Sequence, residues 1–462
     1  MLWVDAICIN QNHLEEKGQQ VAMMDQIYAA AEQVLIWLGK HEESDHVAFQ
    51  AISDLQAHFG RKCNDSHHQF EGLNDPNRIT FKNPMAGSAR WAAVSALVSK
   101  KWFERVWIIQ EVVMAQRALV LRRTRSIPWR ELFTLIYNLT RSRLNALLNL
   151  NSDCPGIKTA SISEMLQAAV GQNEPIELTD MLFLTRYLRA TDPRDKIYSL
   201  VGIYNAMENL GGDVGRLDYK TPPSTLFRNV AAEHLFDKKF IDIMSFVDHG
   251  PCPEGPHSPS WVPQWMELSV SHTPFAFRKS HFRSTCSLKP KCWESPERNQ
   301  LIIAGIRLDQ IFLQGEMYRY EECQARKKFT NYDDQLWYEN HAGRRWLRQS
   351  EAVFNEVRNE QEENEKHPER FWRTIICNMS HEGQMPGREY RDGFKAFYAR
   401  VEAVCNFYDS SKRFVTESEQ ARSQSLANQS HYFSLAFRTW VGGRVFCTTA
   451  GKRIGMFPSA VQ

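Results

Sequence analysis

Apolar residues in the first forty positions follow two different spacings. Residues 2–9 form a short apolar run of strand length, and residues 34–38 form a second one that ends at Gly39. Between them, residues 15–31 carry apolar side chains every three to four positions, which is the spacing of one helix face. A strand, a helix and a second strand in this order predict parallel neighbours in an α/β sheet of flavodoxin-like type.

The rest of the chain shows longer helical patterns and a few further apolar runs. Polar sequence between about 60 and 90 predicts a surface insertion, and a Pro- and Gly-rich stretch at 250–263 predicts a boundary. We expect three parts: a domain at 1–125, a mainly helical region at 126–250, and a mixed β segment at 251–462 with a helical insertion at about 320–430. The predicted helices are 88–100, 102–115, 193–204 and 224–236, and the further predicted strands are 118–122, 301–304 and 445–448.

Composition excludes several classes of protein. The net charge of +2 over 462 residues gives no basic excess, so we expect no nucleic-acid partner. The longest apolar stretch, 106–121, is interrupted by Gln110, Glu111, Gln116 and Arg117, which argues against a membrane span. Ten scattered cysteines without a C-x-x-C pair are typical of reduced, intracellular protein. The absence of a signal-like N-terminus also favours a cytoplasmic location.

Two sequence blocks carry a family resemblance. The first is LWVDAICINQ at 2–11, continued by VLIWLG at 34–39, and the second is WFERVWIIQE at 102–111. Together they closely resemble the fungal heterokaryon incompatibility (HET) domain. Three later stretches, ATDPRDKIY at 190–198, PSWVPQW at 259–265 and the segment 442–455, are similar to the region that commonly follows that domain.

The resemblance implies a function as well as a fold. HET-domain proteins trigger programmed cell death after nonself recognition, so we expect a protein partner in incompatibility signalling, with self-association as a further option. The family pattern also has a strand and helix before the run at residue 2, and more strand after residue 462. The resemblance therefore implies a fragment that lacks these ends.

A remoter resemblance, to Toll/interleukin receptor (TIR) domains, suggests chemistry, because some TIR domains cleave NAD. In that comparison the helix bearing Glu111 takes the place of the helix with the catalytic glutamate. A carboxylate on an otherwise apolar helix face has a raised pKa and suits a ribose hydroxyl or an oxocarbenium-like charge. The competing interpretation is that Glu111 pairs with Arg105 and only orders the helix packing.

Further candidate ligand residues lie near the N-terminus. Asp5, Asn10 and Gln11 stand at or just after the end of the first predicted strand, where parallel sheets bind ligands. Alternatively, Asn10 bonds to the backbone of its own loop. Arg105 is a candidate phosphate ligand, or a residue stacked between tryptophans.

These residues leave two mechanisms open. One is an NAD glycohydrolase that uses Glu111, with NAD as substrate rather than cofactor, and the other is a non-enzymatic module that assembles through the helices and loop after residues 2–9. No histidine or cysteine spacing indicates a metal.

Overall fold

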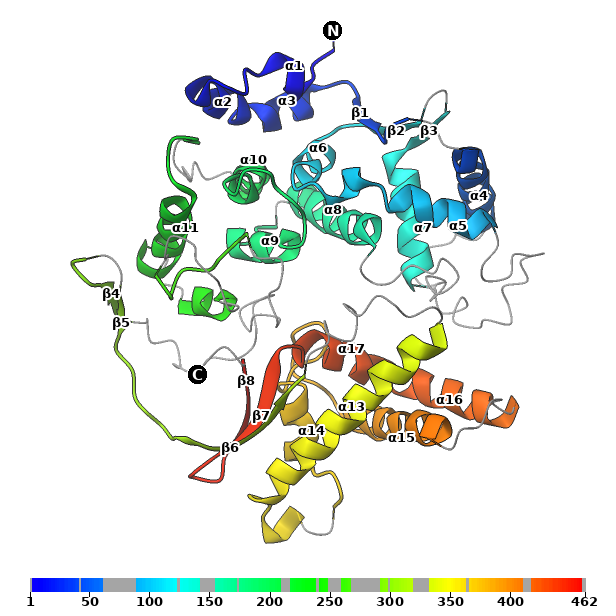
Figure 1. The fold of residues 1–462 in the computed structure, drawn as a ribbon, viewed down its shortest axis with the longest axis vertical. Helices are drawn as coiled ribbons and strands as arrows, with labels where there is room; N and C mark the ends of the chain where they lie inside the picture. Colours follow the sequence, from blue (N-terminus) through cyan, green and yellow to red (C-terminus); the bar gives the residue numbers. More distant parts are fainter. Residues whose placement is uncertain are drawn as a thin grey trace. The chain divides into compact units, whose positions relative to one another are not determined.

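The computed structural model divides the chain into two compact units. Unit 1 comprises Met1–Leu226 and Trp265–Leu268, and unit 2 comprises Phe227–Gln264 and Ser269–Gln462. Figure 1 traces the chain through both, coloured from blue to red. The structure describes residues 2–40, 43–60, 89–122, 125–141, 154–172, 174–208, 217–237, 241–247, 259–266, 291–297, 300–318, 332–362, 365–409 and 417–458. The predicted surface insertion at 60–90 lies almost wholly outside these residues.

The prediction of a strand at residues 2–9 is wrong. Its centre is the short helix α1 (Asp5–Cys8), in which the backbone N–H groups of Ile7 and Cys8 donate to the carbonyl oxygen of Val4. A helical turn satisfies backbone donors locally, whereas a strand needs a neighbour, and none pairs with this segment among the described residues. A short apolar run does not by itself distinguish the two structures.

The predicted helix at 15–31 is present as two helices. They are α2 (Leu14–Val21) and α3 (Met24–Ala30), and the chain turns at Ala22 and Met23 between them. The Nδ1 atom of His13 accepts a hydrogen bond from the backbone N–H of Glu16 and caps the start of α2. Val21 and Met24 are both buried, so the apolar periodicity continues across the break.

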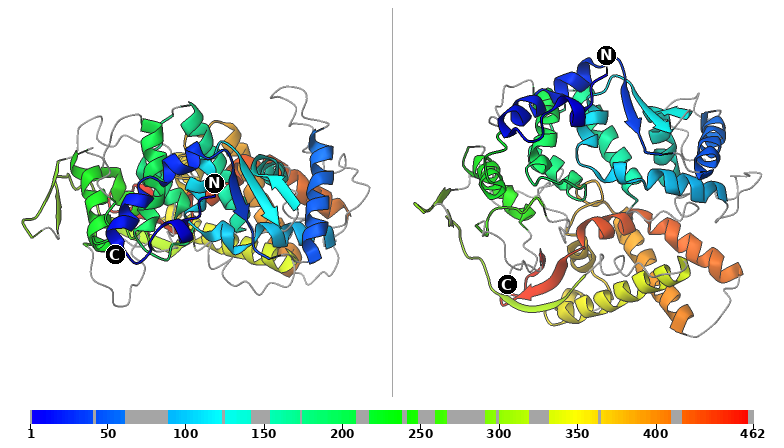
Figure 2. Two further views of the ribbon diagram at one scale, coloured as in Figure 1. Left: turned by 90° about the horizontal axis from the view of Figure 1, so that it is seen from above. Right: turned by 45° about the horizontal axis from the view of Figure 1, so that its top comes forward.

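The small sheet of unit 1 confirms two predicted strands. Strand β1 (Val34–Trp37) runs parallel to β2 (Ala118–Arg122), with Val34 opposite Ala118 and Trp37 opposite Leu121. Strand β3 (Arg125–Pro128), which the sequence analysis missed, pairs antiparallel with β2. Figure 2 shows the three strands beside the helices that pack on them. The unit is therefore mixed α/β, with a sheet of three strands in the order β1-β2-β3.

Helices supply most of unit 1. Apolar side chains from the sheet and from several of these helices form one core, in which Ile36, Phe103, Val120 and Leu132 are fully buried. None of the described helices is both long enough and apolar enough to cross a membrane. The helices are α4 (Glu43–Gly60), α5 (Ala89–Val98), the 3-10 turn η2 (Lys101–Glu104), α6 (Ile108–Val113), α7 (Trp129–Arg141), α8 (Pro155–Gln172), α9 (Leu178–Thr185), α10 (Asp195–Glu208) and α11 (Pro223–Ala232), which continues into unit 2.

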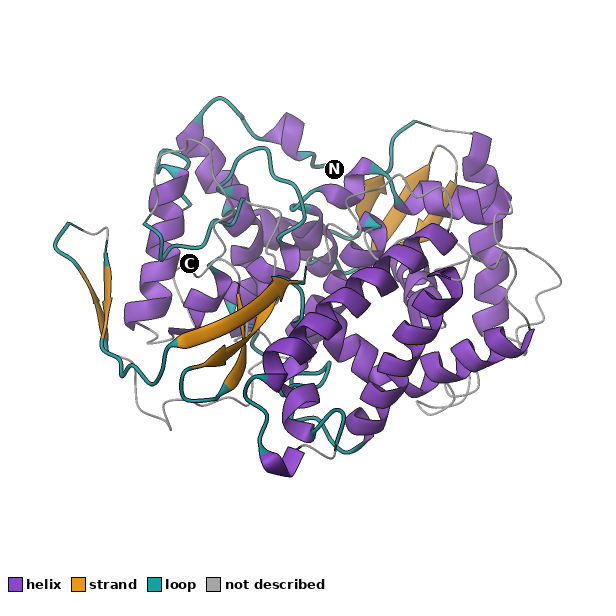
Figure 3. Ribbon diagram, turned by 60° about the horizontal axis from the view of Figure 1, so that its bottom comes forward, coloured by secondary structure: helices purple, strands orange, loops and turns teal. Residues whose placement is uncertain are grey.

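Unit 2 joins a small antiparallel sheet to a helical group, visible in orange and purple in Figure 3. The sheet has the order β6-β7-β8 and packs on a core that includes Trp372, Phe394, Phe433 and Phe446. The predicted strands at 301–304 and 445–448 are confirmed as β5 and β7. The elements are η4 (Glu233–Asp237), η5 (Ile241–Phe246), β4 (Cys292–Glu294), β5 (Leu301–Ile303), β6 (Ile311–Met317), α13 (Tyr332–Asn355), η6 (Glu360–Glu362), α14 (Glu369–Ile375), α15 (Glu389–Asp409), α16 (Glu417–Gln429), α17 (His431–Trp440), β7 (Arg444–Thr449) and β8 (Ile454–Pro458).

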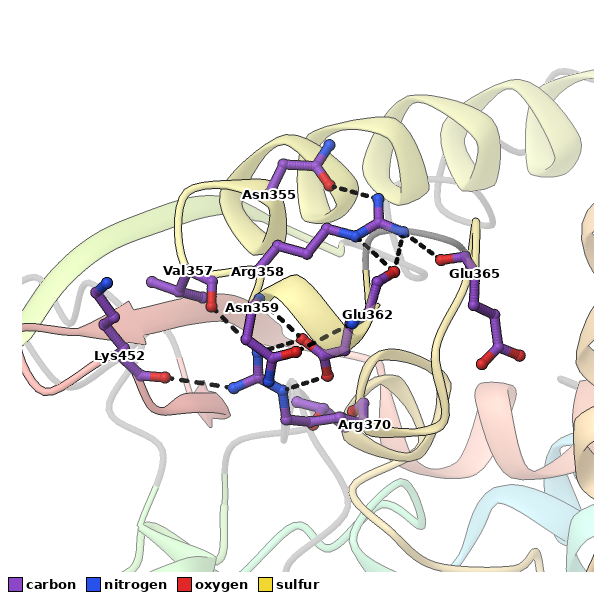
Figure 4. A network of polar contacts seen from close by, with 9 residues as sticks. Asn355, Val357, Arg358, Asn359, Glu362, Glu365, Arg370 and Lys452 are labelled. Carbon is purple, nitrogen blue, oxygen red and sulfur yellow. Dashed lines mark hydrogen bonds and ion pairs between the residues drawn. The ribbon is translucent and has the colours of Figure 1, made fainter.

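Two arginines fix the loop that follows α13, as Figure 4 shows. Arg370 donates to both carboxylate oxygens of Glu362 and to the carbonyl oxygens of Val357 and Lys452. Arg358 donates to the carbonyl oxygen of Glu362. Because these acceptors lie on separate turns of the chain, the network orders the connection between α13 and α14.

Candidate functional site

The candidate site begins with a break in the predicted helix at 102–115. The turn η2 ends at Glu104, and Arg105 takes an extended conformation that forms a parallel bridge with Arg189. The backbone N–H of Val106 donates to the carbonyl oxygen of Arg189 at 2.9 Å, and α6 starts again at Ile108. This tertiary bridge, which local sequence does not show, places Arg105 beside the start of α6.

Glu111 lies on α6 among buried apolar residues. Its side chain is only 13% exposed, and its Oε1 atom is 4.0 Å from a terminal nitrogen of Arg105. The other terminal nitrogen of Arg105 is 4.0 Å from Oδ2 of Asp5. The guanidinium thus faces two carboxylates, at distances that allow electrostatic attraction but exceed a hydrogen bond.

Burial dominates the electrostatics of Glu111. Desolvation raises the pKa of this carboxyl to about 7, because the charged form loses its water. Arg105 and a hydrogen bond from Trp102 act in the opposite direction, while the negative charge of Asp5 adds to the increase. A carboxyl with a pKa near 7 exchanges its proton readily at neutral pH, which is the property of a general acid or base.

Helix α3 places Tyr28 close enough to be affected by the charge of this carboxyl. Tyr28 is half-buried, and burial together with the charges of Glu111 and Asp5 raises the pKa of its hydroxyl. The indole of Trp3 packs edge-on against the Tyr28 ring, with 5.8 Å between ring centres. The candidate centre therefore consists of Asp5, Tyr28, Arg105 and Glu111, all within the first 111 residues.

The structure separates the predicted ligand residues into two groups. Asp5 joins Arg105 and Glu111, although it starts α1 instead of ending a strand, and its Oδ1 atom accepts the backbone N–H of Ala6 at 2.7 Å. Asn10 and Gln11 lie exposed in the turn before α2. The Oδ1 atom of Asn10 accepts the backbone N–H of Asn12, which is the local loop role that the sequence analysis left open.

Two acceptor atoms beside this centre were not predicted. The Oδ1 atom of Asp25 on α3 and the Oε1 atom of Gln110 on α6 are buried and have no hydrogen-bond partner among the described residues. Both residues press against Gly202 of α10, where an added Cβ would come within 2.5 Å of each. No sequence signal indicated these two atoms, because their surroundings depend on how α3, α6 and α10 meet.

The DPRD segment at 192–195 connects this region to the following helices. Arg194 pairs with Asp192 at 2.7 Å and also donates to the carbonyl oxygen of Thr221. The hydroxyl of Tyr219 donates to Oδ1 of Asp195 at 2.6 Å, and the ammonium of Lys17 lies 4.0 Å above the Tyr219 ring. These contacts hold α2 and residues 217–221 against the start of α10.

Comparisons with known proteins agree with the two sequence blocks. Residues 1–111 match the family described as "Heterokaryon incompatibility protein (HET)". The chain is also 25% identical over 315 residues to "Heterokaryon incompatibility protein 6, OR allele" of Neurospora crassa. That alignment covers 57% of this chain and 44% of the relative, so the chain spans less than half the length of that protein. No solved structure matches the chain.

The chain therefore carries a HET domain at residues 1–111, which confirms the family resemblance. Asp5, Tyr28, Arg105 and Glu111 all lie within it. The alignment with the Neurospora crassa protein extends over more residues than the domain contains, so the similarity also includes part of the region that follows.

Proposed function

We propose that this chain acts in heterokaryon incompatibility, as the HET-domain part of a protein that triggers cell death after nonself recognition. The match of residues 1–111 to the HET family carries the proposal, and the similarity to incompatibility protein 6 supports it. The proposal is tested by pairing a fungal strain that expresses the chain with one that does not. Loss of viable heterokaryons is expected, and heterokaryons as vigorous as those of an empty-vector pair would contradict it.

Glu111 is the proposed chemical group of the domain. We propose that the parallel pair β1 and β2, with α6 preceding β2, is the remnant of a TIR-like arrangement in which α6 carries the catalytic glutamate. The observation that favours chemistry is the nearly buried carboxyl with a pKa of about 7 beside Arg105. Groups with such perturbed pKa values concentrate at functional sites. Asp5 and Arg105 would bind the polar parts of the substrate, with Asn10 and Gln11 at the entrance.

The proposed reaction is hydrolysis of the nicotinamide N-glycosidic bond of NAD. The bond between ribose C1′ and the pyridinium nitrogen breaks, and nicotinamide leaves with the bonding electron pair as a neutral ring. Water adds to C1′, and its proton passes to the Glu111 carboxylate and then to solvent. Because this role requires the carboxylate, turnover should increase as pH rises through about 7.

The enzymatic proposal is tested by nicotinamide release from NAD, with wild type, Glu111→Gln and Glu104→Gln compared. Glu104 lies on η2 and pairs with Arg189 at 3.3 Å, so its variant makes the same chemical change outside the centre. We expect turnover to fall at least a hundredfold in Glu111→Gln alone. No release by either protein would exclude the enzyme and leave the interaction module, and equal release by both would exclude Glu111 as the catalytic group.

The part of the chain after the HET domain has a separate proposed role. We propose that residues 126–250 and the mixed β segment from 251 onward form the regions through which a partner signals nonself. The contact of the Lys17 ammonium with the Tyr219 ring supports this role, because it joins α2 of the HET domain to the region that follows. Deletion of residues 251–462 should abolish heterokaryon loss and leave nicotinamide release in place, and a deletion variant that still causes heterokaryon loss would contradict a signalling role.

A further inference from the structure

Lys196 is a buried lysine near the start of α10, directly after the DPRD segment. The residue is only 2% exposed, although lysine is almost never fully buried unless its charge is paired. A buried ammonium needs acceptors for its three N–H donors. The contacts of Lys196 therefore show what its burial achieves.

The Lys196 ammonium binds the turn that follows α9. Its Nζ atom donates to the carbonyl oxygen of Arg186 at 2.8 Å and also to the carbonyl oxygen of Leu188. Both carbonyls lie just beyond Thr185, where α9 ends, and a positive charge is favourable at a helix C-terminus. Lys196 thus fixes the backbone between residues 186 and 188.

The next residue of that backbone, Arg189, orders Arg105. The backbone N–H of Arg189 donates to the carbonyl oxygen of Glu104 at 2.5 Å, and its carbonyl oxygen accepts the N–H of Val106 at 2.9 Å. These two hydrogen bonds flank the parallel bridge that holds Arg105 extended between η2 and α6. The two carbonyls that the ammonium binds therefore directly precede this bridge in the chain.

We propose that Lys196 is a positioning residue for the candidate centre, which holds residues 186–189 in place so that the bridge keeps the Arg105 guanidinium beside Glu111. Without the ammonium, two buried carbonyl oxygens lose their donor, and the segment moves to regain hydrogen bonds. The bridge moves with it, and Arg105 loses its place near the carboxylate. This inference rests on the proposed role of Glu111, and it gives the ATDPRDKIY stretch a part in controlling that group.

The charge of Lys196 is present at neutral pH and lost in mildly alkaline solution. Burial lowers the pKa of its ammonium to about 8, and no charged side chain is among the causes. The other charged side chains of residues 186–195 have partners of their own, in the pairs Arg186–Phe183, Arg189–Glu104, Arg194–Asp192 and Asp195–Tyr219. Hydrogen bonds from an ammonium are stronger than those from a neutral amine. The hold on residues 186–188 should therefore weaken as pH rises through about 8.

The pH dependence of nicotinamide release tests the proposal with Lys196→Met and Lys196→Arg. Burial raises the pKa of Glu111 and Arg105 opposes this rise, so Lys196→Met should move the increase in turnover to higher pH, by about half a pH unit. Lys196→Arg keeps the charge and the donors and should restore the wild-type midpoint. Lys40→Met, at an exposed position after β1, is the control and should leave the midpoint unchanged. A stable or destabilised Lys196→Met with the wild-type midpoint would overturn the proposal.

The wild-type protein provides a second test if Lys196→Met does not fold. Its kcat/KM should fall above about pH 8, mainly through a higher KM, because a displaced Arg105 no longer binds the polar parts of the substrate. Lys196→Arg should lack this fall, since a guanidinium stays charged. A wild-type kcat/KM that stays level up to pH 9 would overturn the proposal.

Carboxyl carbon-13 NMR answers the same question without turnover. In protein labelled at the glutamate side chains, the signal that disappears in Glu111→Gln reports the protonation of Glu111. Its midpoint should lie near pH 7 in wild type and higher in Lys196→Met. A shifted midpoint without nicotinamide release would contradict the enzyme and support the positioning role. Equal midpoints in proteins that do release nicotinamide would overturn this inference alone.

Discussion

The guanidinium of Arg105 lies 4.0 Å from the carboxylate of Glu111, close enough to attract it and too far to form a hydrogen bond. Arg105 is about half exposed, so water screens its charge. Burial of Glu111 therefore outweighs the attraction, and the pKa of its carboxyl stays raised, at about 7. A paired structural carboxylate would show the opposite direction, and this difference is what favours a chemical role.

The raised pKa of Glu111 predicts an unusual pH dependence of stability. The folded state holds the proton up to about pH 7, whereas the unfolded chain releases it near 4.5. Stability should therefore fall as pH rises between these values, by about 3 kcal/mol in total. Glu111→Gln should lack this decrease. Urea unfolding of wild type and Glu111→Gln at pH 5, 6, 7 and 8 measures this dependence. If the free energy of unfolding changed with pH in the same way in both proteins, the pKa of Glu111 would not be raised.

The ion pair between Arg122 and Asp45 should be essential for unit 1. Arg122 donates two hydrogen bonds of 2.9 Å to the Asp45 carboxylate, and both side chains are buried. Asp45→Asn should lower the free energy of unfolding by about 3–5 kcal/mol, because it leaves a buried charge without its counterion. Asp54→Asn, on the same helix as Asp45, breaks an exposed pair with Arg90 of α5 and should cost less than about 1 kcal/mol. Similar losses in both variants would contradict the burial of Arg122.

The hydroxyl of Tyr219 should stabilise the contact between α2 and the start of α10. Tyr219→Phe removes only the oxygen that donates to Asp195, and it leaves a buried carboxylate with one donor fewer. We expect a loss of about 1–3 kcal/mol in thermal unfolding. Tyr432→Phe, at an exposed position, is the matched control and should be neutral. An unchanged melting temperature in Tyr219→Phe would show that this hydrogen bond is dispensable.

Close packing of α2 against the backbone at Leu217 should make Gly18 intolerant of any side chain. A Cβ at this position would overlap the carbonyl oxygen of Leu217, which is backbone and cannot move aside cheaply. Gly18→Ala should therefore destabilise unit 1 by about 1–3 kcal/mol. Gly343→Ala lies in the middle of α13 with open space around it, and should stabilise by about 0.5–1 kcal/mol. The free energy of unfolding should therefore fall in Gly18→Ala and rise in Gly343→Ala. A rise or a fall in both variants would contradict the prediction.

Sequence patterns predicted those parts of the fold that depend on local periodicity. The strands β1 and β2 carry alternating buried residues such as Ile36 and Val120, so their apolar runs were informative. The run at 2–9 failed because strand formation needs a pairing partner, and none is present among the described residues. The helix at 102–115 failed because the bridge between Arg105 and Arg189 overrides local propensity.

Only the local features of the candidate site were predictable from the sequence. The apolar neighbours of Glu111 on α6 are visible in the sequence, and they indicated a desolvated carboxyl. The approach of Asp5 to Arg105 was not visible, since it joins two segments that are a hundred residues apart in the sequence. The positions of Tyr28 and Asp25 depend in the same way on the packing of α3, to which the sequence assigned only a core role.

The most direct test of the account is hyphal cell death after induced expression of the chain, scored with a membrane-impermeant dye. Wild type and the control Glu104→Gln should kill compartments at equal rates, and Glu111→Gln at matched abundance should not. This result would place the incompatibility function of the HET domain at Glu111. Equal killing by wild type and Glu111→Gln would contradict that assignment.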